Sequence, residues 1–405
     1  VVARALSTIF RKLSQPPVIG EMIAGILLGP SLLGWVAPDL FAALFPVENY
    51  SLLGVMSELG LVLFLFLIGL EHDPVLMRGR AETAVLTSHV SIAFPFCLGV
   101  LLALFLYPRL GDGRVPFTHF ALFMGSGMSI TAFPVLARIL ADRALLHTPV
   151  GLLALICASV DDVTGWLILA GVLLLIGASP TSLPLWASIL GTGVYALVML
   201  RAGRRLFAPI GVRFRAHGLT MNLLAIMLLI ALVSAWITER LGIHPLFGAF
   251  LAGIAMPRDG ALAEAVWTRL HDVTILLFVP LFFALTGLKT SIVLLGGLEM
   301  WAYFALILTV AVAGKLGGAA FAARIAGVPW REAISLGVLV NTRGLVELVV
   351  LNIGLEVGVI SPRLFAMMVL MAITTTLMAT PLLDRIYPPR LRGPAASQVA
   401  TPGGG

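Results

Sequence analysis

The segment Ala158-Ser159-Val160-Asp161-Asp162-Val163-Thr164-Gly165-Trp166 places two adjacent carboxylates inside the apolar stretch 149–177. A charge at the centre of a bilayer-length helix costs roughly 3 kcal/mol or more on insertion scales. An apolar segment of this length offers no solvated face for such a pair. We therefore expect the two carboxylates either to be neutralised by a cation inside a helical bundle or to bind ions and protons that move.

The composition around this pair excludes a soluble globular domain, since 60% of the residues are hydrophobic and only 11% are charged. A helix needs about 20 mostly apolar residues to cross the hydrocarbon core, so we predict an all-α polytopic membrane protein with about 13 transmembrane helices. The predicted spans are 1–14, 17–33, 51–70, 83–107, 117–140, 149–177, 183–208, 219–240, 244–256, 266–288, 298–326, 331–355 and 361–383.

The basic residues are unevenly distributed over the two sides of this arrangement. Of the 26 Lys and Arg residues, about 18 fall on one side and 5 on the other. By the positive-inside rule, the richer side, which includes the loop 201–215 and the C-terminus, is cytoplasmic, and an odd helix count puts the N-terminus outside. This placement predicts a lipid bilayer as the partner of the basic residues, and no nucleic acid.

One sequence segment occurs twice. Pro-Val-Ile-Gly-Glu-Met-Ile-Ala-Gly-Ile at 17–26 recurs as Pro-Leu-Phe-Gly-Ala-Phe-Leu-Ala-Gly-Ile at 245–254, with five identical positions and no gap. The copies are an odd number of helices apart, so they cross the membrane in opposite directions, which is the inverted-topology repeat of many secondary transporters. The alternative is chance recurrence, because Gly and Ala are common wherever membrane helices pack closely.

The same offset pairs the fifth predicted helix with the twelfth. Both carry polar and helix-breaking residues at mid-membrane depth, in Gly125–Pro134 and Gly337–Gly344. Pro134 lacks a backbone N–H donor and favours an interruption of its helix. Irregular backbone at this depth is tolerated where it is buried or lines a cavity, and two broken helices in twin positions point to a transporter's substrate site. We predict two discontinuous crossing helices beside the acidic pair, with simple kinks as the alternative.

Three further charged residues lie inside predicted helices, in addition to the acidic pair. Arg343 and Glu347 are four residues apart, so they share a helix face and can pair, balancing charge at the crossing without touching a transported ion. Lys315 has no such local partner, and we expect Asp161 to accept a hydrogen bond from it. Asp162 is then the carboxylate without a fixed counter-charge, and it is the predicted position at which a proton and a cation exchange.

Hard oxygen ligands select an alkali cation over a soft transition metal. Asn341 aligns with Thr131 in the repeat and lies with Arg343 at the second break, where opposed half-helix ends need charge balance. No catalytic residue and no resident cofactor is predicted. The predicted ion- and proton-binding oxygens, which main-chain carbonyls freed by the first break would join, are those of Asp162, Asp161, Thr131 and Ser129.

Five motifs carry a resemblance to a known family. They are Gly25–Pro30, Phe66–Glu71, Ser129–Arg138, Val160–Val163 and Asn341–Glu347. In this order they resemble the monovalent cation:proton antiporter superfamily, specifically its second branch, which contains bacterial sodium/proton antiporters, potassium efflux systems and plant cation/proton exchangers. The resemblance spans nearly the whole chain, through Pro381.

The resemblance implies the sodium/proton antiporter fold, with 13 helices, a core crossing at helices five and twelve, a separate dimerisation domain, a homodimer and elevator-like alternating access. It also implies that Asp162 is the main ion and proton carrier and that Asp161 is bridged to Lys315. An Asp-Asp pair is typical of members that exchange two protons for one sodium, so we predict electrogenic sodium/proton antiport in a bacterial plasma membrane. The segment 341–347 is most similar to plant exchangers, which leaves potassium/proton antiport as the alternative.

The predicted domains follow from this assignment. They are the dimerisation-side helices at 1–82 with a truncated first helix, core helices at 83–177, a linker helix and cytoplasmic loop at 178–215, three helices at 216–297, core helices at 298–388 and a disordered tail at 389–405. A cation channel and an organic-anion symporter are weaker alternatives. A channel needs a continuous wide pore, and a carboxylate pair makes a poor anion site.

Overall fold

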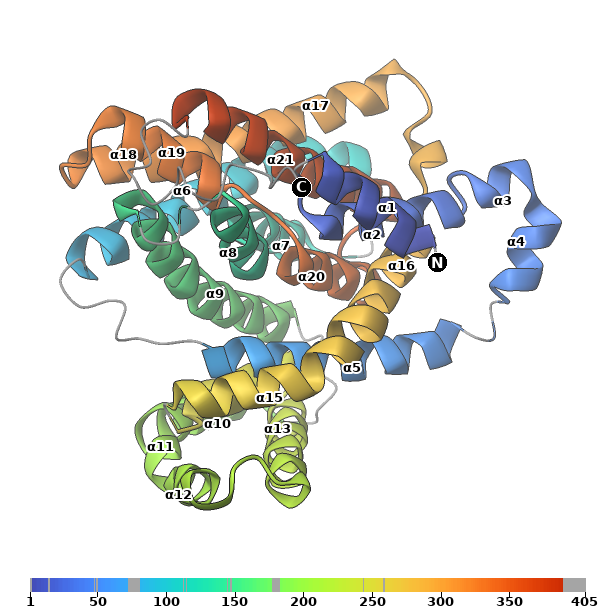
Figure 1. The fold of residues 1–405 in the computed structure, drawn as a ribbon. Helices are drawn as coiled ribbons and strands as arrows, with labels where there is room; N and C mark the ends of the chain where they lie inside the picture. Colours follow the sequence, from blue (N-terminus) through green and yellow to red (C-terminus); the bar gives the residue numbers. More distant parts are fainter. Residues whose placement is uncertain are drawn as a thin grey trace, which may run out of the picture. The chain divides into compact units, whose positions relative to one another are not determined.

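The computed structural model of the chain describes residues 2–388, except 14, 47, 49, 72–80, 112, 114, 144, 146–147, 177–182, 243 and 258. Within these residues every regular element is a helix (Figure 1), so the predicted all-α fold is confirmed. The tail that we predict to be disordered, 389–405, lies outside the described residues.

The described residues form these helices, in chain order. They are α1 (Val2–Lys12), α2 (Pro17–Leu28), α3 (Leu33–Val36), α4 (Pro38–Leu44), α5 (Tyr50–Glu71), α6 (Ala81–Leu110), α7 (Phe117–Ser129), α8 (Phe133–Asp142), α9 (Pro149–Ile176), α10 (Leu185–Arg201), α11 (Gly203–Leu206), α12 (Ala208–His217), α13 (Met221–Arg240), α14 (Pro245–Ala255), α15 (Gly260–Val273), η3 (Thr274–Phe278), α16 (Val279–Lys289), η4 (Ile292–Leu295), α17 (Leu298–Val312), η5 (Ala313–Gly317), α18 (Gly318–Ile325), α19 (Trp330–Val340), α20 (Leu345–Glu356) and α21 (Pro362–Ile386).

Every predicted span falls on one or more of these helices, but the predicted number of membrane crossings is not confirmed. In the described part of the chain, eight helical stretches are long and apolar enough to cross a bilayer, and ten if each of two bent helix pairs is one span. The helices α1 and α14 have 11 residues each, about half of the roughly 20 that a straight crossing needs.

The described residues form two compact units, each assembled from separate stretches of sequence. The first unit takes its residues from Val1–Leu44, Val75–Leu169 and Thr286–Gly405, and the second from Phe45–Pro74 and Ala170–Leu285. The acidic pair on α9 and both interrupted helices therefore belong to the first unit.

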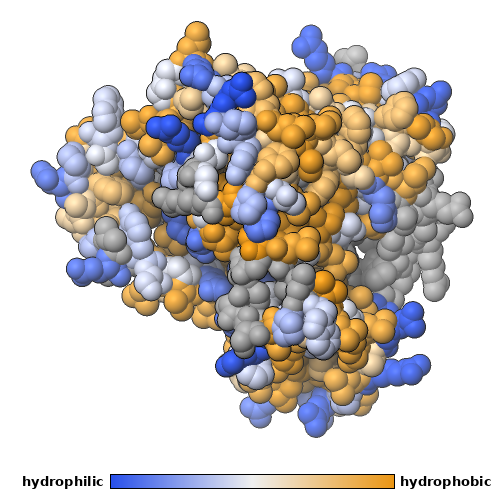
Figure 2. Space-filling model, turned by 180° about the vertical axis from the view of Figure 1, so that it is seen from behind, coloured by the Kyte–Doolittle hydropathy of each residue, from blue (hydrophilic) through white to orange (hydrophobic). Residues whose placement is uncertain are grey.

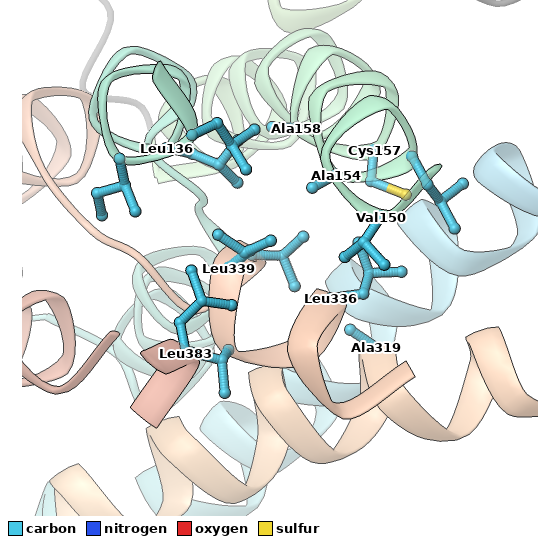
Figure 3. Close-up of a cluster of buried hydrophobic side chains, with 14 of the residues drawn as sticks. Leu136, Val150, Ala154, Cys157, Ala158, Ala319, Leu336, Leu339 and Leu383 are labelled. Atoms are coloured by element: carbon cyan, nitrogen blue, oxygen red, sulfur yellow. The ribbon is translucent and has the colours of Figure 1, made fainter. Parts of the chain in front are cut away.

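A cluster of buried apolar side chains in the first unit fixes α9 next to the acidic pair. Leu136 on α8, Ala158 on α9 and Leu339 on α19 converge there, and Leu383 of α21 closes the cluster (Figure 3). Ala158 is one helical turn before Asp161 on α9, so the cluster lies next to the acidic pair. This packing sets the position of the carboxylates relative to both helix breaks.

In the second unit, α5 and α14 approach each other at glycines. A Cβ atom added to Gly253 would lie 2.3 Å from the carbonyl oxygen of Phe66, and one added to Gly69 would lie 2.3 Å from that of Phe250. Backbones this close leave no room for a side chain, as in other small-residue contacts between membrane helices. Gly69, and Gly253 in the second copy of the repeated segment, thus have a packing role in the second unit.

We expect Gly253→Ala to destabilise the protein by about 1–3 kcal/mol, because the two backbones must separate to admit the methyl group. Thermal unfolding of the purified protein in detergent measures this. The control is Gly193→Ala on α10, where an added Cβ meets nothing within 4 Å. The control should unfold at or slightly above the wild-type temperature, since Ala favours the helix. An unchanged unfolding temperature for Gly253→Ala would contradict the close contact.

Candidate ion-binding site

The acidic pair lies beside two interrupted helices of the first unit. Residues 130–132 separate α7 from α8, and residues 341–344 separate α19 from α20, with a bend of 45° between the latter two helices. The two breaks are joined directly, because the backbone N–H of Ala132 donates to the carbonyl oxygen of Thr342 over 3.0 Å. The freed backbone groups of one break thus find partners in the other, which satisfies them away from water.

The position of Pro134 differs from the prediction that this residue interrupts the fifth helix. Pro134 is the second residue of α8, so the break at residues 130–132 precedes it. In the first turn of a helix the backbone N–H has no intrahelical acceptor, and a proline there costs no hydrogen bond. The proline therefore starts the second half-helix.

Cationic side chains cap the C-terminal end of α7. The guanidinium of Arg343 donates from Nη1 to the carbonyl of Gly127 and from Nη2 to that of Met128, each over 2.8 Å. The Lys315 ammonium donates to the carbonyl of Ser129 over 2.6 Å. The last carbonyls of a helix lack intrahelical donors and carry partial negative charge, so both cations stabilise this buried half-helix end.

Arg343 is itself held by two neighbours. It donates from Nη1 to Oε1 of Glu347 over 2.9 Å, and both side chains are fully buried. The hydroxyl of Thr376 on α21 accepts from the Arg343 backbone N–H over 2.9 Å and donates to the Arg343 carbonyl over 2.7 Å. Arg343 and Glu347 thus neutralise each other within the crossing, and Thr376 fixes the backbone of the second break.

We expect Thr376→Val to lower the free energy of unfolding by about 1–3 kcal/mol, because the Arg343 N–H and C=O lose their buried partner. Chemical or thermal unfolding in detergent measures the change. Thr375→Val is the matched control, because the Thr375 hydroxyl is equally buried but, among the described residues, bonds only to carbonyls of its own helix. If both variants lost the same stability, the Thr376 contacts would have no special role in the break.

Asp161 is the fully occupied member of the acidic pair. Its Oδ2 lies 2.9 Å from the Lys315 ammonium and 2.6 Å from the Thr131 hydroxyl, and its Oδ1 accepts from the Ser88 hydroxyl over 2.5 Å. The Ser91 hydroxyl lies 3.2 Å from Oδ2. These donors come from α6, the first break and η5, so Asp161 joins three other segments and has its charge balanced by Lys315.

Asp162 has a different environment although it is equally buried. The backbone N–H of Phe133, at the start of α8, hydrogen-bonds to it. Its Oδ1 is fully buried and has no hydrogen-bond partner among the described residues. The N-terminal end of a helix carries partial positive charge, which partly offsets a buried carboxylate. Asp162 therefore presents one unoccupied carboxylate oxygen at the first break.

The remaining predicted ligands contribute less directly. The Ser129 hydroxyl lies 2.8 Å from the Gly125 carbonyl and 3.0 Å from the Ile92 carbonyl, so its hydrogen is used in packing α7 against α6. The group of Ser129 that meets the acidic pair is its main-chain carbonyl, through Lys315. Asn341 is buried at the second break, and its Oδ1 has no hydrogen-bond partner in the described part of the chain.

Our sequence reasoning missed Ser88 and Ser91, the two α6 hydroxyls at Asp161. A signal was present, since Thr87-Ser88-His89-Val90-Ser91 is a polar run inside the otherwise apolar predicted span 83–107. Serine in a membrane helix often bonds only to its own backbone, so this run alone does not indicate a partner on another helix.

Comparison with known proteins agrees with this arrangement. Residues 1–386 match the family described as sodium/hydrogen exchanger, transmembrane. The chain is 44% identical over 392 residues to the Na(+)/H(+) antiporter NhaS4 of Synechocystis, and the alignment covers 96% of this chain and 95% of that protein.

Two eukaryotic relatives are longer. The chain is 39% identical to Cation/H(+) antiporter 17 of Arabidopsis thaliana and 34% identical to K(+)/H(+) antiporter 1 of Saccharomyces cerevisiae. The alignments cover 96% and 97% of this chain but only 47% and 46% of those proteins, so the chain spans about half their length.

The fold also has a solved counterpart. The sodium proton antiporter MjNhaP1 from Methanocaldococcus jannaschii superposes with a TM-score of 0.68, covering 96% of this chain and 95% of that one at 13% sequence identity. At this identity the likeness concerns the fold alone. Since the family match and the Synechocystis alignment each extend over nearly all of the chain, this polytopic membrane protein belongs to the transmembrane sodium/hydrogen exchanger family and is a transporter, not an enzyme.

Proposed function

We propose that the protein exchanges sodium for protons across the membrane and that Asp162 is the group for which the two ions compete. Antiport of a cation against protons follows from its family and its relatives. The observation that carries the assignment to Asp162 is its buried Oδ1, which has no partner among the described residues, beside an Asp161 that is fully occupied.

Competition at Asp162 follows from electrostatics. A buried carboxylate is costly while it is charged and unpaired, so it takes up either a proton or a cation. Sodium is a hard cation that prefers oxygen ligands, and Asp162, Thr131 and main-chain carbonyls of the first break supply them. One occupant excludes the other, and this exclusion couples the two fluxes.

The ion pair of Asp161 with Lys315 supplies a second proton in this proposal. When sodium draws Asp161 towards itself, Lys315 loses its counter-charge and its buried ammonium releases a proton. Two protons then move against one sodium ion, which transfers net charge across the membrane. The contact that breaks is the 2.9 Å bond from Lys315 Nζ to Asp161 Oδ2.

Alternating access by an elevator-like movement is the proposed transport step. In its support, the residues that bond to Asp161, Asp162 and Arg343 all belong to the first unit. The site can therefore move as one body without losing these bonds. The homodimer, the inverted repeat and the cytoplasmic C-terminus stay predictions from the sequence.

Potassium/proton antiport is the second candidate. Two observations favour it, the 34% identity to the K(+)/H(+) antiporter 1 of Saccharomyces cerevisiae and the segment Asn341–Glu347 that is similar to plant exchangers. The buried Asp161–Lys315 ion pair favours the sodium assignment, because it supplies the second proton of an electrogenic exchange.

Antiport in proteoliposomes with Na⁺, K⁺ or Li⁺, with and without a clamped membrane potential, tests the proposal. We expect Na⁺ to collapse a preset pH gradient at lower concentration than K⁺, at a rate that depends on the potential. Where protons dominate the site, the half-saturating Na⁺ concentration should rise about tenfold per pH unit of acidification for each competing proton. A preference for K⁺ or independence from potential would favour the second candidate.

A further inference from the structure

A strongly basic bend joins two helices of the second unit. It comprises residues 201–217, which we call the basic elbow, and carries five arginines at 201, 204, 205, 213 and 215. No Asp or Glu occurs from residue 201 to residue 238. Such a run of one charge repels itself unless a partner of opposite charge neutralises it.

The elbow is held in a defined shape. The apolar helix α10 ends at Arg201, and the segment Gly203–His217 turns away from it by 55°. A Cβ atom added to Gly203 would lie 2.7 Å from the Cβ of Ala255, and one added to Gly211 would lie 3.2 Å from Pro257. The elbow is thus packed against the end of α14 and the residue Pro257 after it, and its bend directs α12 away from the axis of α10.

Exposed apolar side chains lie among the arginines of the elbow. Leu206 is 65% exposed and Val212 is 59% exposed. Ala208, Val212 and Ala216 are four residues apart on α12 and form an exposed apolar strip, with Arg213 next to it. Figure 2 shows hydrophobic and hydrophilic residues exposed side by side on the face that it draws. A helix with an apolar strip bordered by arginines is typical of segments that lie in the membrane interface.

The charges of the elbow are only partly balanced within the protein. Arg215 lies 3.5 Å from Asp259, the residue that precedes α15, and Arg204 is half-buried. Arg201, Arg205 and Arg213 are exposed and make no ion pair among the described residues. Three outward guanidinium groups therefore remain on one short segment.

We propose that the basic elbow is a binding site for the headgroups of anionic phospholipids. Guanidinium groups bind phosphate oxygens through paired, charge-assisted hydrogen bonds. Clustered basic residues directly beside a membrane span select anionic lipids, each basic residue contributing about fivefold in affinity. Continuity with α10 places the arginines at headgroup depth, and Leu206 and Val212 reach towards the acyl chains. This site is independent of the acidic pair and of the transported ion.

Native mass spectrometry of the purified full chain, offered phosphatidylglycerol and phosphatidylcholine in equal amounts, tests the site. We expect wild type to retain phosphatidylglycerol preferentially, and the triple variant R201Q/R205Q/R213Q to lose this preference by about 100-fold at low salt. The variant R201K/R205K/R213K keeps the positive charge and should keep most of the preference for phosphatidylglycerol. R109Q/R240Q/R363Q removes the same charge from exposed positions at other helix ends and should bind like wild type.

Two outcomes would overturn the site. One is a glutamine variant that still prefers phosphatidylglycerol, and the other is displacement of the bound lipid by millimolar inorganic phosphate, which would make the elbow an anion site without lipid specificity. Cation/proton exchange in phosphatidylcholine vesicles should persist in the glutamine variant, which shows that the variant is folded. If all variants lost cation/proton exchange while the lipid preference stayed intact, the result would count against the transport proposal and not against the lipid site.

Discussion

Asp162→Asn is expected to abolish cation-dependent proton movement in proteoliposomes. The amide cannot take up a proton at the carboxylate oxygen or balance the charge of a bound cation. Two unit charges about 4 Å apart interact by about 4 kcal/mol at the effective dielectric of proteins, which corresponds to an affinity loss of about 100-fold to 1000-fold. The measurement is collapse of a preset pH gradient on addition of Na⁺.

The control for this variant is its stability. Asp162 is buried and its Oδ1 has no partner among the described residues, so Asp162→Asn should unfold at the wild-type temperature or above it. Lost transport with retained stability would then be specific to the ion site. Sodium/proton exchange that persists in Asp162→Asn would show that another group carries the ions.

Lys315→Met has the second large expected effect, a loss of about 3–5 kcal/mol of stability. Removing one partner of a buried ion pair leaves an uncompensated charge in the interior. Here Asp161 would lose its only ion-pair partner among the described residues, and the Ser129 carbonyl would lose its donor at the end of α7. Thermal and chemical unfolding in detergent measure the change.

A double-mutant cycle with Asp161→Asn isolates the interaction of the pair. The double variant Asp161→Asn/Lys315→Met should recover much of the lost stability, because neither charge is then left unpaired. In the proposed mechanism it also loses the second proton, so its sodium/proton exchange should become insensitive to membrane potential. Additive losses from the two single variants would mean that the ion pair does not couple them.

The sequence predicted the larger features of this site from charges that have few possible partners. Lys315 has no acidic residue within four positions along its own helix, which singled out Asp161, and the structure has the Lys315 ammonium 2.9 Å from Oδ2 of Asp161. Arg343 and Glu347 are four residues apart, so each is the other's partner on one helix face. Charged residues in apolar segments have so few possible partners of opposite charge that the sequence alone restricts which residues they pair with.

The hydroxyl contacts could not be predicted in the same way. Ser129, Ser88 and Thr376 can each bond to their own helix or to a neighbour, and the choice depends on helix rotation that no sequence pattern fixes. Ser129 uses its hydroxyl in packing, whereas Ser88 reaches Asp161 and Thr376 holds the second break. The sequence also did not fix the residue at which the second half-helix starts. Pro134 was predicted to interrupt the helix, but it is the second residue of α8.

Competition between sodium and protons at Asp162 is measured by proton release when sodium binds. The purified protein is kept in weakly buffered detergent solution with a pH indicator, and NaCl is added, with choline chloride as the control. We expect wild type to acidify the solution, saturably with Na⁺, and Asp162→Asn not to do so. Saturable sodium binding to wild type without any proton release would contradict competition at Asp162.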